Sequence, residues 1–140
     1  MNKKGFTLIE LLIVVAIIGL LSTLAVVALG SARVKARDSK RLADLKQLQT
    51  ALELYYTDNT SYPTGPGINL GSTNYVCLNS TGFAATGCAN PYMGAVPKDP
   101  NNTDYYVYTA ASSSYSVTTA LEGSVGSLSG TVTLSPAGLQ

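Results

Sequence analysis

The sequence contains no histidine and no tryptophan, and only 12% of its residues are charged. The absence of histidine removes the side chain that most often serves as a general base or metal ligand near neutral pH. The sequence also lacks a glycine-rich phosphate loop, a Cys-x-x-Cys pair and an HExxH motif. We find no nucleophile–base pair either. We therefore expect a protein that is not an enzyme and has no cofactor and no metal site.

Cysteine is scarce too, with only Cys77 and Cys88, both in a polar part of the chain. In an exported domain an even, closely spaced pair indicates a disulfide, and two free thiols are the alternative. The bridge would close a loop of about a dozen residues and contribute roughly 3 kcal/mol of stability in the chain-entropy model. The formal net charge of +1 gives no overall attraction to nucleic acid or to an anionic membrane.

A long apolar run near the N-terminus stands out against this polar background. Lys3 and Lys4 precede it, Glu10 lies at its head, and no charged residue occurs from Leu11 to Ala32. As a helix rising about 1.5 Å per residue, this run reaches roughly 33 Å, enough for a hydrocarbon core of about 30 Å. The run is apolar on all sides, which predicts a helix that is buried in a membrane or in an assembly.

The segment Lys-Lys-Gly-Phe-Thr-Leu-Ile-Glu-Leu-Leu-Ile-Val-Val resembles the N-terminus of type IV prepilins and of type II secretion pseudopilins. The resemblance implies that a membrane aspartyl protease, the prepilin peptidase, cleaves between Gly5 and Phe6 and methylates the new amine of Phe6. It also implies that the helix anchors the subunit in the cytoplasmic membrane, with its N-terminus in the cytoplasm, and later packs into the core of an extracellular filament. An ordinary signal anchor is one alternative, and a secretory signal peptide cleaved near Ala28–Ala32 is another.

Glu10 is the one carboxylate in this apolar segment, and a charge there is costly in lipid. In a filament the amine of a neighbouring Phe6 is the available cation. We therefore hypothesise that Glu10 pairs with that amine and sets the axial register between subunits; snorkelling to the membrane interface is the alternative. Gly19 has no proline after it in this helix, so local melting on assembly and close helix packing at Gly19 both remain open.

From Arg33 to Asp58 the spacing of apolar residues predicts an amphipathic second half of the same helix. The apolar stripe that we expect to pack on a small domain consists of Leu42, Leu45, Leu48, Leu52, Tyr55 and Tyr56. The polar side chains that we expect on the opposite face, in solvent, are Asp38, Lys40, Arg41, Asp44, Lys46 and Gln47.

A basic cluster follows the apolar run directly and consists of Arg33, Lys35, Arg37, Lys40 and Arg41. We interpret this cluster as a solvated helix face, or as a surface for lipid headgroups or for acidic neighbours in a filament. Nucleic acid is a further alternative, because some pilins bind DNA. However, no aromatic residue interleaves the cluster, as a stacking surface for bases would require.

The residues from Ser61 to Asp104 are rich in Gly, Pro, Asn, Ser and Thr and are predicted to form a long, loop-rich stretch, within which the cysteine pair closes a shorter loop. Beyond them, alternating residues predict strands at Tyr105–Ala110, Ser114–Leu121 and Thr131–Leu134, with a turn region at Gly123–Gly130. We therefore expect an α+β, pilin-like fold, in which one long N-terminal helix packs on a small three-stranded antiparallel sheet. The expected parts are a leader (1–5), an apolar helix (6–32), an amphipathic helix (33–58), a loop region with the disulfide (59–104) and the sheet (105–140).

The Pro-Lys-Asp-Pro segment before a tyrosine-rich strand is similar to the major pseudopilins of type II secretion. In that family, acidic residues around the following loop hold calcium. Calcium takes about six to eight oxygens, and after Asp104 this chain offers only Glu122, so we expect no calcium site.

We interpret the chain first as the structural subunit of a type IV pilus-like filament. Its expected partners are other copies of itself, the prepilin peptidase, pilus or secretion assembly machinery, and the membrane before assembly. The alternatives are a type II secretion pseudopilin and a soluble exported binding domain whose signal peptide has been removed.

Overall fold

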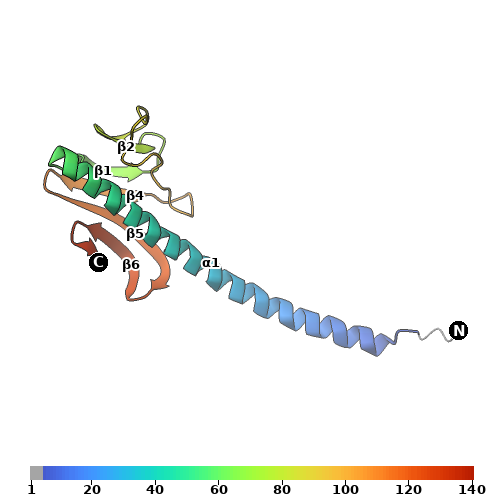
Figure 1. Cartoon of the computed structure of the whole chain (residues 1–140). Coiled ribbons are helices and arrows are strands. Elements are labelled where there is room, and N and C mark those ends of the chain that lie inside the picture. Colours follow the sequence, from blue (N-terminus) through green and yellow to red (C-terminus); the bar gives the residue numbers. More distant parts are fainter. Residues whose placement is uncertain (1–4) are drawn as a thin grey trace. The chain divides into compact units, whose positions relative to one another are not determined.

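The computed structural model describes residues 5–140 of the chain (Figure 1). Two compact units make up the chain, Met1–Val34 and Lys35–Gln140. The basic residues of the predicted leader, Lys3 and Lys4, lie outside the described residues.

Helix α1 (Leu8–Asn59) begins in the first unit and continues into the second. The prediction of a single long N-terminal helix is therefore confirmed. The helix is continuous through Gly19 in the single subunit, since no break divides the element. All residues from Gly5 to Arg33 are exposed, so among residues 5–140 no other part of the chain covers the apolar side chains of this segment. Such a surface requires lipid or other protein chains around it.

The second unit contains a five-stranded antiparallel sheet in the order β1-β4-β5-β6-β7. Its strands are β1 (Gly65–Leu70), β4 (Tyr106–Ala111), β5 (Ser114–Val125), β6 (Leu128–Ser135) and β7 (Gly138–Leu139). A separate two-stranded sheet consists of β2 (Cys77–Asn79) and β3 (Gly82–Ala84). The second half of α1 lies against the larger sheet, as Figure 1 shows. The α+β class is thus confirmed.

The expected number of three strands is wrong. The predicted loop region 59–104 contains β1, β2 and β3, and β7 adds a strand near the C-terminus. These strands are short and rich in turn-forming residues, so they lack the alternation of apolar and polar residues that predicts a strand. Edge strand β1 begins Gly-Pro-Gly and its register shifts between Pro66 and Ile68, which is where sheets tolerate proline and glycine. The turn between β5 and β6 is also shorter than the predicted turn region Gly123–Gly130, because β5 ends at Val125 and β6 begins at Leu128.

The hydrophobic core lies between α1 and one face of the larger sheet. Leu45, Leu48 and Leu52 of the predicted stripe are fully buried, whereas Tyr56 is 37% exposed. From the sheet, the alternating residues of β5 point inward, as the sequence pattern predicted; the buried ones are Tyr115, Val117, Thr119 and Leu121. Two tyrosines of β4, Tyr106 and Tyr108, are also fully buried.

The polar face predicted for α1 is partly wrong. Asp38, Arg41 and Asp44, which we expected in solvent, are 0%, 1% and 6% exposed. They lie on the same side of α1 as the leucines, because positions 38, 41 and 45 follow one another at helical spacing. Each finds a charged or hydrogen-bonding partner outside the helix, which is the condition for burying such groups.

Cys77 and Cys88 are joined in a disulfide, with their Cα atoms 6.0 Å apart. The ring is not an irregular loop, because the β2–β3 hairpin lies inside it. Leu78 of β2 is fully buried and exchanges backbone hydrogen bonds with Met93. The bridge therefore supports a small element that is part of the core.

Candidate functional site

The first functional candidate is the start of α1, where Thr7 and Glu10 form a reciprocal pair. The backbone N–H and the hydroxyl of Thr7 donate to Glu10 Oε2 at 2.9 and 2.6 Å. The Glu10 N–H donates to the Thr7 hydroxyl oxygen at 3.3 Å. This is a capping box, which satisfies the free donors at a helix N-terminus. The Thr-x-x-Glu spacing is visible in the sequence, and a capping role for Thr7 could have been predicted from it.

The predicted cleavage residues lie just before the helix. Gly5 and Phe6 precede α1 and both are exposed, with Phe6 at 76%. Glu10 is therefore one turn of helix beyond the chain end that cleavage would create. Exposure leaves this bond open to a membrane peptidase, although cleavage and methylation at Phe6 stay predictions.

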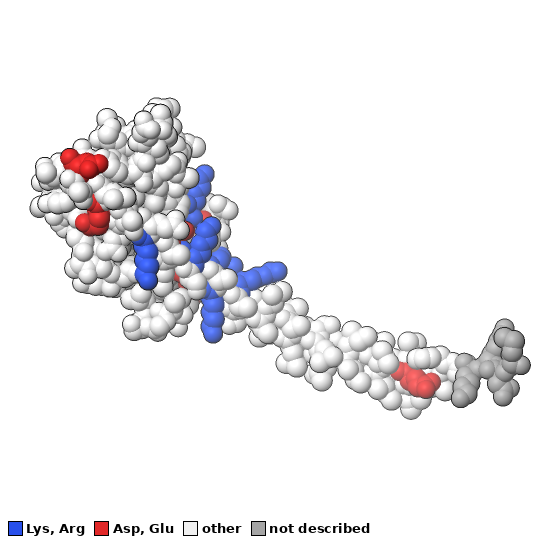
Figure 2. All heavy atoms as spheres, viewed as in Figure 1, with Lys and Arg blue, Asp and Glu red and all other residues white. Residues whose placement is uncertain are grey.

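The apolar surface of α1 is the second candidate. By length and composition, α1 is long and apolar enough to cross a membrane. Figure 2 shows a long surface without charged side chains, as expected from the uncharged run Leu11 to Ala32. Its side chains offer packing area and no chemistry, which suits an anchor and a filament core.

A charged cluster in the second unit is the third candidate, and sequence reasoning missed it. The guanidinium of buried Arg41 donates to both oxygens of Asp99, at 2.7 and 2.9 Å. Its Nη1 also donates to Asp38 Oδ1 and to Glu122 Oε1, each at 2.7 Å. Three carboxylates thus converge on one cation from α1, from the loop before β4 and from β5. Arg37 adds a second guanidinium, which donates to both carboxylate oxygens of Glu122.

Asp38 fixes the backbone of β5 within this cluster. Its carboxylate accepts the N–H groups of Glu122 at 3.0 Å and Gly123 at 2.8 Å. At this place the register of β5 and β6 shifts between Ala120 and Ser124, so the irregular segment does not continue a regular ladder with β6. A helix side chain supplies the missing acceptors, and α1 is thereby tied to β5.

The electrostatics of the cluster follow from these contacts. Hydrogen bonds from Arg37 and then Arg41 lower the pKa of Glu122 to about 2. Burial acts to raise the pKa of Asp38 and of Asp99, but hydrogen bonds outweigh it and both pKa values end below the usual range. These bonds come from the β5 backbone and Arg41 for Asp38, and from Arg41 and the Asn101 N–H for Asp99. All three carboxylates are therefore ionised at neutral pH.

The predicted basic cluster is divided by the structure. Arg37 and Arg41 are committed to Glu122, Asp38 and Asp99. The other members, Arg33, Lys35 and Lys40, are exposed. The interpretation of all five cations as a solvated or partner-binding face is therefore wrong for Arg41, because its guanidinium already has three anionic partners.

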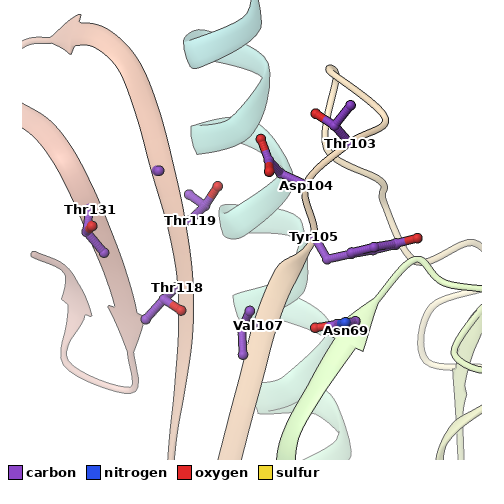
Figure 3. Close-up of a pocket in the computed structure, with 9 residues that line it drawn as sticks. Asn69, Thr103, Asp104, Tyr105, Val107, Thr118, Thr119 and Thr131 are labelled. Atoms are coloured by element: carbon purple, nitrogen blue, oxygen red, sulfur yellow. The ribbon is translucent and has the colours of Figure 1, made fainter.

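A groove along β4 and β5 was not foreseen (Figure 3). Figure 3 shows Thr103 and Asp104 on the loop before β4, and Asn69 on β1. The remaining labelled side chains are Tyr105, Val107, Thr118, Thr119 and Thr131. The lining is mainly hydroxyl, amide and apolar, and Asp104 is its one charged residue. It offers a contact surface without an acid–base pair.

The comparisons with known proteins match both parts of the chain. A profile described as "Prokaryotic N-terminal methylation motif" matches residues 1–30. A second profile, "Type II secretion system (T2SS), protein G", matches residues 28–132, which include nearly all of the second unit. The chain belongs to the type II secretion protein G family. The predicted relationship to pilins and pseudopilins is thus confirmed.

Relatives of this pseudopilin family member include two proteins named "Type II secretion system core protein G". The one from Pectobacterium carotovorum is 35% identical over 74% of this chain and 65% of its own length. The one from Escherichia coli is 36% identical over 74% of this chain and 70% of its own length. "Type IV wide pilus major component PilA4" from Thermus thermophilus is 34% identical over 81% of this chain and 70% of its length. The match therefore spans about two thirds of these relatives, and no solved structure matches the chain.

Calcium, which the resemblance to major pseudopilins implies, does not fit the residues of this family member. After Asp104 the chain has Glu122 as its one acidic residue. Both oxygens of that carboxylate are engaged by Arg37 and Arg41. Within residues 5–140, no group of three or more His, Cys, Asp or Glu side chains is placed to hold a metal ion. A calcium ion needs several free oxygens, and this set does not supply them.

Proposed function

We propose that this chain is a structural, non-enzymatic subunit of a type II secretion pseudopilus. The observation that supports this proposal most strongly is the match of residues 28–132 to the protein G profile. This match includes nearly all of the sheet-bearing unit, a region that lies outside the N-terminal motif shared by pilins and pseudopilins. The type IV pilus, our first interpretation from sequence, thereby becomes the second candidate.

In the proposed route, prepilin peptidase cleaves after Gly5 and methylates Phe6. The subunit waits in the cytoplasmic membrane with its N-terminus in the cytoplasm, and it then enters a filament through α1. The uncovered apolar surface of the first unit supports both stages, because lipid and neighbouring helices can each cover it. The secretion machinery is the proposed partner outside the filament.

The second candidate function, a subunit of a surface pilus, rests on one specific observation. The Thermus relative that is named a pilus component matches more of this chain, 81%, than the two secretion proteins described above, at 74%. Both candidates share the membrane-anchored precursor and the helical filament core. They differ in what the filament does.

A deletion strain of the source organism, complemented with the wild-type gene, separates the two functions. We expect deletion to remove specific proteins from the culture medium while surface filaments persist. Mass spectrometry of the mature subunit should find an N-terminus at N-methylated Phe6. Loss of surface filaments with normal secretion would favour the pilus, and a mature N-terminus near Ser31 or Arg33 would contradict both proposals and favour the soluble exported domain.

A further inference from the structure

The charged cluster around Arg41 indicates how this subunit holds α1 against its larger sheet. Asp38, Asp99 and Glu122 come from three separate elements and meet at one point. Converging carboxylates repel one another unless a cation lies between them. Here that cation is the guanidinium of Arg41, which is 1% exposed and donates hydrogen bonds to all three carboxylates.

The geometry of Arg41 suits a permanent structural cation. Its fork meets Asp99 with two parallel bonds, at 2.7 and 2.9 Å, the arrangement in which arginine binds a carboxylate most specifically. A guanidinium remains charged at every physiological pH. It therefore fills the position continuously, whereas a metal ion would exchange with solvent.

We infer that Arg41 serves in this chain as the resident cation that joins three elements, namely α1, β5 and the loop that precedes β4. It does so in place of a divalent metal. The positive charge that balances the three carboxylates is then built into the sequence. As a consequence, the folded subunit takes up no calcium at this joint, and its stability does not depend on the calcium concentration.

Thermal unfolding of the full chain in detergent tests this inference, followed by near-UV circular dichroism of its nine tyrosines. For the wild type, millimolar calcium and excess chelator should give the same Tm. The Arg41→Gln variant keeps a hydrogen-bond donor but leaves three carboxylates without their cation. In chelator its Tm should fall by about 10 °C or more, and calcium should recover part of that loss, because a ligand that binds the folded state stabilises it.

Two further variants keep the test decisive. Lys46→Gln removes an exposed positive charge from the same helix, and its Tm should match the wild type with or without calcium. Arg41→Lys retains the charge without the fork, so it should lose less stability than Arg41→Gln and stay insensitive to calcium even if Arg41→Gln fails to fold. A wild-type Tm that rises with calcium would overturn the inference, as would an Arg41→Gln protein that folds without any response to calcium, or a calcium-sensitive Arg41→Lys protein.

Discussion

Asp44 illustrates how a single buried acid is tolerated in the second unit. It is 6% exposed, and the hydroxyl of fully buried Tyr106 donates to its Oδ2 at 2.8 Å. Burial raises the pKa of Asp44, and the hydrogen bond from Tyr106 and the charge of Lys40 offset only part of that rise. Burial and the same carboxylate also raise the pKa of Tyr106. The fold therefore keeps a polar pair that is satisfied but not electrostatically favourable.

Asp44→Asn should stabilise the protein at neutral pH. The folded-state pKa of Asp44 lies above its unfolded value, so folding penalises its ionised form at pH values above the folded pKa, and the penalty vanishes below the unfolded pKa of about 3.9. Asparagine retains an acceptor for Tyr106 without the charge. We expect a higher Tm than wild type at pH 7 and equal values near pH 3.

Tyr106→Phe provides the comparison for this prediction. It leaves the Asp44 carboxylate buried without its donor, and it should lower the free energy of unfolding by about 1–3 kcal/mol. Denaturant unfolding at pH 7 measures both variants. A destabilised Asp44→Asn protein at pH 7 would show that the charge itself, through neighbours such as Lys40, contributes to the fold.

At the scale of elements, the disulfide ring supports a part of the core. The β2–β3 hairpin inside the ring contributes Leu78, which is fully buried, and the Val96 N–H donates to the carbonyl of Val76 just outside it. Breaking the ring therefore frees a segment that packs against the rest of the second unit, and the effect should extend beyond a surface loop.

The Cys77→Ser/Cys88→Ser double variant should lose roughly 3 kcal/mol of stability, the value expected for closing a ring of about this size. Reduction of the wild type should lower its Tm to that of the variant, whereas the variant should not respond to reductant. Peptide mapping without reduction should recover the two cysteines in one linked peptide. Complete alkylation of both thiols in the unreduced exported protein would contradict the bridge.

At the scale of the whole molecule, we predict that filament assembly depends on one carboxylate, that of Glu10. Glu10 caps its own helix through Thr7, and in our hypothesis it also pairs with the Phe6 amine of a neighbouring subunit. At about 4 Å and an effective dielectric near 20, that attraction would be roughly 4 kcal/mol before desolvation of the two groups. The capping bonds give the carboxylate a partner while the subunit is still single.

Glu10→Ala should therefore leave membrane insertion intact and abolish filament assembly, as judged by filament yield after N-terminal processing has been verified. Glu10→Gln is the matched control, because glutamine also forms a capping box but carries no charge. We expect Glu10→Gln to fail as well, which would assign assembly to the charge. Normal filaments from Glu10→Ala would assign the register to apolar packing alone.

Local patterns in the sequence determined the features that depend on neighbouring residues. The start and end of α1, the processing motif, the cysteine pair and the inward face of β5 were all predictable, because helix periodicity, strand alternation and short motifs are properties of a few consecutive residues. The placement of Leu45, Leu48 and Leu52 in the core followed from the same periodicity.

Tertiary structure alone decided the features that depend on distant partners. Strands β1, β2 and β3 carry too few alternating residues to be predicted, and they exist because neighbouring strands and the disulfide supply their contacts. Arg41 reads as a solvated helix cation until its partners Asp99 and Glu122, 58 and 81 residues away, are placed beside it. Charged groups can be buried only where opposite charges or hydrogen-bonding groups meet them, and the chain positions that meet are set by the fold.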